Sequence, residues 1–438
     1  MIRRARQIVA VLASFSVLVL GRSTVGLAVP QWVPDDGSYA GNEAIRYATS
    51  APSDAVARLQ HQIDAGAARL SFDGTTGYLR SVLQALRIPV ESQLLVFSRT
   101  SFQRDLISPA RPRALYFGPS VYVGWIPGAP QLELAAADPQ LGAVFYTLGQ
   151  EATARPTFQR ETRRCLQCHE SASQTAGVPG FIMKSVVADA SGEPVLSAGT
   201  RATTDQSPLE ERWGGWYVTG TAGAQRDMGQ HATVDRVVRS DGYLTGHSDI
   251  VALMVLAHQK HVQNLITRLN YRTRMAIAFD RLRNVELGRE AGFVPPETRS
   301  LVAREVEPLV QAMLFADEAP LADAVEGTSG FAATFAGEGP RDGTGRSLRD
   351  MDLNHRLFRY PCSYLIYSES FDALPVPARD RVYERLWAVL GGEDRSEPFV
   401  HLTAEDRSAV VSILLDTKPG FAAWRAAHPD GVGVARSH

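Results

Sequence analysis

Short runs of hydrophobic residues between Ser92 and Leu148 predict β-strands in this part of the chain. Glycine and proline separate the runs, and both interrupt strands, because glycine favours turns and proline has no N–H to donate. The expected strands are residues 94–97, 115–117, 121–123 and 144–146. Two later runs, 181–187 and 193–196, flank Ser191-Gly192 and predict a hairpin that turns at those two residues.

Beyond residue 240 the apolar residues recur at the spacing of an α-helix. Ser248 or Asp249 is the expected N-cap of a long helix that begins near Ile250, since both side chains accept hydrogen bonds from free backbone N–H groups. Further helices are expected over residues 275–287 (as a continuation or a separate helix), 301–316, 379–390 and 410–415, the last after a capping box at Thr403. The predicted fold class is α+β, with a β-rich N-terminal half and a mainly helical C-terminal half.

The first 28 residues have the pattern of a secretory signal peptide. A basic start with Arg3 and Arg4 precedes an apolar run over residues 8–20, and small residues precede a plausible cleavage point after Ala28. The run is shorter than the roughly 20 residues that a membrane-spanning helix needs. We therefore expect cleavage, with a retained anchor as the alternative. The expected location is the periplasm or another compartment outside the cytoplasm, with no stable membrane span after cleavage.

Composition narrows the range of partners. The 438 residues include 45 Lys+Arg and 47 Asp+Glu, for a formal charge of −2, which argues against nucleic acid as a partner. Three cysteines are too few for a disulfide scaffold. Lysine occurs only at Lys184, Lys260 and Lys418, and we attribute this preference for arginine to genome composition rather than to function.

Residues 165–169 read Cys-Leu-Gln-Cys-His, the C-x-x-C-H spacing that attaches haem covalently. Two thiols one helical turn apart each add to a haem vinyl group, and the adjoining histidine then ligates the iron. A redox dithiol is disfavoured, because thioredoxin-like sites follow a strand in a βαβ unit. A structural zinc needs two further ligands, and Cys362 supplies only one. A disulfide across so short a loop would be strained.

The motif resembles that of c-type cytochromes, in particular large secreted bacterial proteins with a single cytochrome c motif, over about residues 165–231. The resemblance implies one covalently bound haem c, held by Cys165 and Cys168 through thioether bonds, with His169 as the proximal iron ligand. It also implies that the backbone carbonyl of Pro179 accepts a hydrogen bond from the ring of His169, unless Pro179 only forms a turn.

The resemblance makes Met228 the expected sixth iron ligand, because small cytochromes c take a methionine well after the motif. Met228 lies in a polar, glycine-flanked loop, where a methionine that only fills the core would be unusual. His231, another histidine and an open site are the alternatives. Met183 falls in a strand pattern, which favours an ordinary packing role.

Three other features are candidates for a part in the site. His247, His258 and His261 share one stripe of the long helix, and we expect a solvated or internally satisfied face there rather than a metal site. Residues 213–217 (Trp-Gly-Gly-Trp-Tyr) either pack on a haem face or form a buried strand with close backbone approach at the glycines. Cys362 is expected to be a buried free thiol.

Together these features predict an exported monohaem c-type cytochrome that transfers electrons to or from a redox partner protein. The alternative is a peroxidase-like haem oxidoreductase with an open distal site, and a haem-based sensor is a third reading. The predicted organisation is a signal peptide (1–28), a mixed region (29–150), a haem-binding region (151–240), a helical region (241–316), a loop or linker (317–350) and a helical C-terminal region (351–438).

Overall fold

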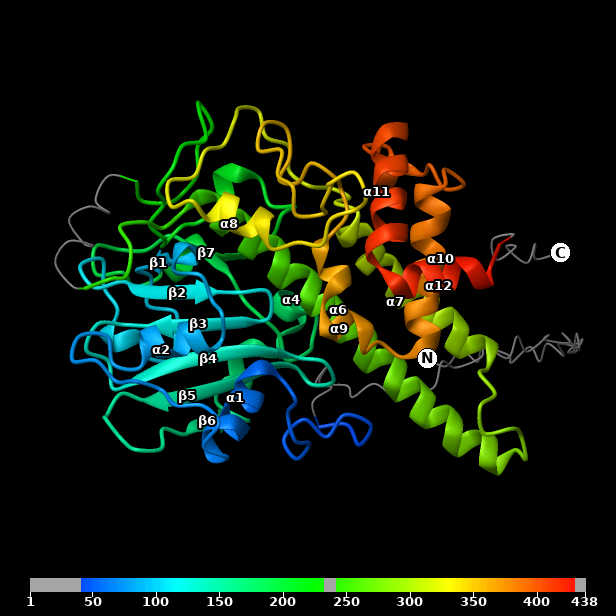
Figure 1. The fold of residues 1–438 in the computed structure, drawn as a ribbon, viewed down its shortest axis with the longest axis horizontal. Coiled ribbons are helices and arrows are strands. Elements are labelled where there is room, and N and C mark those ends of the chain that lie inside the picture. Colours follow the sequence, from blue (N-terminus) through cyan, green and yellow to red (C-terminus); the bar gives the residue numbers. More distant parts are fainter. Residues whose placement is uncertain (1–40, 232–241, 430–438) are drawn as a thin grey trace, which may run out of the picture.

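A computed structural model describes residues 41–231 and 242–429. It has a six-stranded antiparallel sheet in the N-terminal half and mainly helices in the C-terminal half (Figure 1), which confirms the α+β prediction. The predicted signal peptide, residues 1–28, lies outside the described residues, as does the end of the predicted haem-binding region, residues 232–240.

The six strands follow one another in chain order across the sheet, each antiparallel to the next. They are β1 (Leu94–Val96), β2 (Arg113–Phe117), β3 (Val121–Trp125), β4 (Gln131–Asp138), β5 (Gly142–Gly149) and β6 (Phe158–Glu161). The four predicted strands coincide with β1, β2, β3 and β5. Strands β4 and β6 were not predicted, although successive residues of β4 alternate between buried and half-buried, as they do when side chains point to opposite faces of a sheet.

Each face of the sheet carries its own hydrophobic core. Tyr116, Leu134 and Tyr146 pack on one face against α1 (Ala55–Asp64) and α2 (Leu79–Ala85). The register pairs Tyr122 with Ala135 and Ala135 with Phe145, so these three side chains form a row across the opposite face. That row belongs to the core that the sheet shares with the C-terminal helices.

Helix α6 (Ile250–Glu286) is a single helix of 37 residues, so the segment expected over 275–287 is its continuation. The carboxylate of Asp249 caps it by accepting hydrogen bonds from the N–H groups of Val251 and Ala252. Its first half is buried on every side, because it lies between the sheet and the C-terminal half of the chain (Figure 1). A helix in such a position needs no polar face. The C-terminal half of the chain ends in α10 (Val376–Leu390), which contacts α6, and in α11 (Ala404–Thr417) and α12 (Pro419–Ala427), which pack on α10.

Helix α7 (Pro296–Met313) packs between α6 and α10. The capping box predicted at Thr403 forms at the start of α11. Segment 317–350, predicted as a loop or linker, contains the short helix α8 (Phe331–Gly337), which packs into the shared core. Helix α9 (Glu369–Asp372) is one turn long. No helix in the described ranges is long and apolar enough to cross a bilayer.

In the part of the chain that the structure describes, these elements are linked by six single turns of 3-10 helix: η1 (Val90–Ser92), η2 (Arg104–Leu106), η3 (Leu196–Ala198), η4 (Leu209–Glu211), η5 (Tyr364–Tyr367) and η6 (Glu397–Phe399). The predicted hairpin forms around Ser191-Gly192, where the N–H of Val195 donates to the carbonyl of Val187 at 2.8 Å and Ala188 pairs with Pro194. The earlier part of its first run, β7 (Lys184–Val186), does not pair with residues 193–196 but with β8 (Thr200–Ala202), which follows η3.

Candidate functional site

The C-x-x-C-H motif forms one turn of helix, α3 (Leu166–His169), directly after the edge strand β6. The N–H groups of Cys168 and His169 both donate to the carbonyl of Cys165, at 3.2 and 2.9 Å. Residues three and four positions apart lie on the same side of a helix. Cys165, Cys168 and His169 therefore face one way, and all three line the same cavity.

A backbone carbonyl holds the ring of His169 in place. His169 Nδ1 lies 2.9 Å from the carbonyl oxygen of Gly180, and because a carbonyl only accepts, Nδ1 carries the proton and Nε2 keeps its lone pair. The prediction named Pro179, and it was wrong by one residue. The Pro179 carbonyl instead accepts from the N–H of Ala143, which ties the segment to strand β5.

The protonation state of the motif suits metal ligation. Burial lowers the pKa of His169 to about 4, which keeps the imidazole neutral at physiological pH, and the neutral form is the one that binds metals. The ring packs against Phe145 with 4.6 Å between the ring centroids. Burial, with help from the nearby carboxylates of Glu161 and Glu133, raises the pKa of the Cys165 thiol to about 11, whereas Cys168 is exposed to solvent.

The cavity in front of the motif has a volume of about 380 Å³, within the roughly 300–1,000 Å³ usual for ligand and cofactor sites. Its floor is the sheet face that carries Tyr122, Ala135 and Phe145. Its other walls come from residues 181–184, from Trp216 and from Leu256 on α6. Most of this lining is apolar, so it suits a large flat group with a hydrophobic body.

Neither the family-model scan nor the searches of curated proteins and of solved structures found a match to this chain. The interpretation of the cavity therefore depends on its own residues. Two thiols at the attachment spacing, a neutral imidazole with a free Nε2 and an apolar cavity in front of them fit a covalently held haem.

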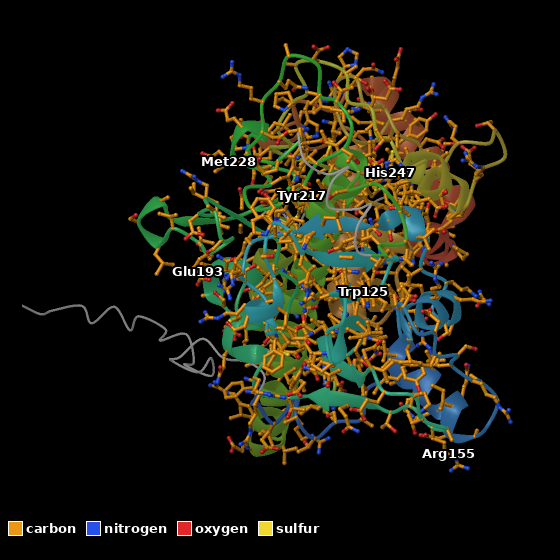
Figure 2. The ribbon with its side chains drawn as sticks, turned by 90° about the vertical axis from the view of Figure 1, so that its left-hand side faces the viewer. Trp125, Arg155, Glu193, Tyr217, Met228 and His247 are labelled. Carbon is orange, nitrogen blue, oxygen red and sulfur yellow. The ribbon has the colours of Figure 1, made fainter. Side chains whose placement is uncertain are left out.

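The structure does not bring Met228 to this cavity. Met228 lies in a separate hollow that also includes Phe97 and Tyr217, and the hydroxyl of Ser185 donates to its sulfur at 3.7 Å. Met228 and Tyr217 are labelled in Figure 2. The spacing argument came from small helical cytochromes, whereas here the β7–β8 hairpin separates the motif from Met228. The methionine that lines the cavity is Met183, which also packs in the shared core, as its strand pattern predicted.

The histidine alternatives also lie elsewhere. The ring of His231 pairs with Asp227 at 3.0 Å and is half-exposed. His258 and His261 of α6 both bind Asp205 through Nδ1, at 2.8 and 3.0 Å. These two agree with the expectation of internally satisfied histidines, although the sequence offered no sign that a loop residue far from α6 would be their partner. The predicted stripe was wrong for His247, because α6 begins only at Ile250, and the ring of His247 lies 3.0 Å from the hydroxyl of Thr328.

The aromatic segment 213–217 contributes to the cavity through one of its two tryptophans. Trp216 lines the cavity and its indole N–H donates to the carbonyl of Lys184 at 2.8 Å. Gly214 permits the close backbone approach that was expected, since a Cβ there would lie 2.5 Å from the carbonyl oxygen of Val186. Cys362 is a buried free thiol, as predicted.

Two lysines of the cavity went unnoticed in the sequence. Lys184 at the start of β7 and Lys260 on α6 both line it. The only signal in the sequence was that lysine is rare, and rarity does not predict that two lysines lie in the same cavity. The cavity therefore carries positive charge beside its apolar surface.

Proposed function

We propose that this chain is an exported monohaem c-type cytochrome that transfers electrons. The observation that supports it is the common placement of Cys165, Cys168 and His169 on one turn of helix at the wall of a single apolar cavity. Export to the periplasm, as the sequence pattern of residues 1–28 suggests, is part of the proposal, because c-type haem is attached outside the cytoplasm.

Each residue of the motif has a distinct task in this proposal. Cys165 and Cys168 tether the haem, and His169 ligates its iron through Nε2. The Gly180 carbonyl keeps the proton on Nδ1, which orients the ring and makes the other nitrogen a better donor. The bound haem supplies one-electron exchange between ferrous and ferric iron. The apolar walls exclude water, and the exposed position of Cys168 leaves that edge of the site accessible to a partner protein.

The proposal is tested first on the unmodified protein, produced with its own leader in a bacterium that matures c-type cytochromes. We expect the haem to stay with the polypeptide through acid–acetone extraction and denaturing electrophoresis, and the pyridine haemochrome to have the absorption of a c-type haem. Haem that is extracted freely, or a polypeptide without haem, would overturn the proposal.

Met183 is proposed as the sixth ligand, because it is the thioether in the cavity and is almost fully buried. Met183→Leu, which nearly conserves volume, is expected to remove the methionine–iron charge-transfer band of the ferric protein and to lower its reduction potential. Met228→Leu is the matched control and is expected to leave both unchanged. Loss of the band only in Met228→Leu would contradict the assignment. A high-spin wild-type spectrum that responds to cyanide would instead favour the peroxidase-like alternative.

A further inference from the structure

Six charged side chains line the cavity, and four of them neutralise one another in pairs. Arg113 and Glu133 form an ion pair at 2.8 Å, and both side chains are largely shielded from solvent. Arg164 and Glu161 form a second pair, at 2.6 Å. These two acids are therefore already matched, each by an arginine.

The other two charges, on Lys184 and Lys260, are both positive. Within the described residues, neither Nζ makes a hydrogen bond or an ion pair. The third lysine of the chain, Lys418, shows the contrast, because its Nζ lies 2.5 Å from a carboxylate oxygen of Asp372. The unpaired lysines are thus the two that share the cavity.

The use of lysine at these two positions is itself informative. Apart from Lys418, the other lysine or arginine side chains of the chain are all arginines, a preference that genome composition explains. Such a bias explains the scarcity of lysine but not the presence of two of the three lysines in one cavity. An ammonium is a compact point charge on a flexible stem, whereas a guanidinium is a wide planar fork. A lysine therefore takes less room beside a bulky bound group than an arginine does.

Lys260 is the stronger anchor of the two, because it is only 2% exposed. The carboxylate that acts on it electrostatically is Asp205, but both oxygens of Asp205 already accept hydrogen bonds from His258 and His261. Burial lowers the pKa of Lys260 to about 8, and Asp205 opposes this shift. A buried ammonium without a partner is costly, and a negative charge placed in the cavity would relieve that cost.

We propose that Lys184 and Lys260 form a carboxylate-binding site within the cavity. Two sources of carboxylate fit this chemistry: the carboxylate groups at the edge of the haem itself, and a small free carboxylate that enters beside it. The first source rests on the proposed function, and the second does not. In both cases the lysines act on the bound group by charge, and Lys184, which is less buried, lies nearer the solvent side.

The test uses the haem-loaded protein with Lys260→Met and Lys184→Met, and with Lys418→Met as the matched control outside the cavity. The reduction potential is measured by spectroelectrochemical titration, without and with acetate. Thermal unfolding shows whether each variant is folded. If Lys260→Met does not fold, because position 260 is buried, the reduction potential of Lys184→Met still tests the proposal.

If the haem carboxylates occupy the site, each cavity variant is expected to lower the potential, since loss of a nearby positive charge favours ferric iron. A shift of ~59 mV in the reduction potential of this one-electron couple changes the ratio of reduced to oxidised protein tenfold at a fixed solution potential. Acetate has no effect in that case. If a free carboxylate occupies the site, acetate shifts the wild-type potential with saturation, and the half-saturating concentration rises at least tenfold in the cavity variants.

The proposal is overturned if Lys260→Met and Lys184→Met match Lys418→Met in both measurements. If the wild-type protein carries no covalent haem, the proposed function fails separately. The lysine site is then judged by calorimetric titration of the haem-free chain with acetate. Binding that is lost in Lys260→Met supports the site, and no binding, or equal binding in wild type and variant, overturns it.

Discussion

Replacement of both Cys165 and Cys168 by serine is expected to abolish covalent haem attachment and to leave the fold intact. A serine hydroxyl does not form the thioether bond, so no tether remains even where haem still enters the cavity. In the haem-free chain, where both are free thiols, the substitutions are expected to lower the free energy of unfolding by about 0.5 kcal/mol, because one side chain is exposed and the other half-buried. Haem staining after denaturing electrophoresis measures the attachment, and circular dichroism checks the fold.

The third cysteine offers a matched control for this experiment. Cys362 is fully buried in the shared core, away from the cavity, and burial raises the pKa of its thiol to about 12. Cys362→Ala is therefore expected to keep the full amount of covalent haem. If haem stays attached to the denatured double serine variant, or if Cys362→Ala loses its covalent haem, then the haem is attached at other residues.

The parts of the fold that the sequence predicted are those with strong local signals. The N-cap of α6 at Asp249 and the capping box at Thr403 depend on side chains that act within one turn of their helix, and both predictions were confirmed. Strand β4 was missed, because its second half is a run of alanines, which alternate in exposure without alternating in hydrophobicity. The hairpin around Ser191-Gly192 was predicted, but the pairing of β7 with β8 was not, because it depends on where the chain returns after η3.

The residues of the candidate site also fall into two groups, those that local spacing predicts and those that only tertiary packing brings to the cavity. Local spacing was enough to place Cys165, Cys168 and His169 together, because one helical turn brings them to one side. It was not enough for Met183, which reaches the cavity through the path of residues 181–184 over the sheet face. Lys260 is a similar case, since it comes from a helix that begins 81 residues after the motif ends, and only tertiary packing joins the two.

A buried group of three residues has the geometry of a catalytic triad but is not accessible to a substrate. Ser363 Oγ and His258 Nε2 lie 2.8 Å apart, and His258 Nδ1 lies 2.8 Å from Asp205, which is the order of a serine hydrolase triad. Yet Ser363 and His258 are completely buried, and neither lines the cavity. A nucleophile that no substrate reaches has no catalytic use, so we assign this group a role in stability.

His258→Ala is accordingly expected to lower the free energy of unfolding by about 3–5 kcal/mol, measured by urea denaturation. The change leaves a void where the ring stacks on Phe315 at 4.2 Å, and it removes a partner from buried Asp205. His231→Ala is the matched control, since it also removes a histidine at 3.0 Å from an aspartate, but here the histidine is half-exposed, and we expect a cost under about 1 kcal/mol. Equal losses in the two variants would mean that burial of the His258 group contributes nothing to the fold.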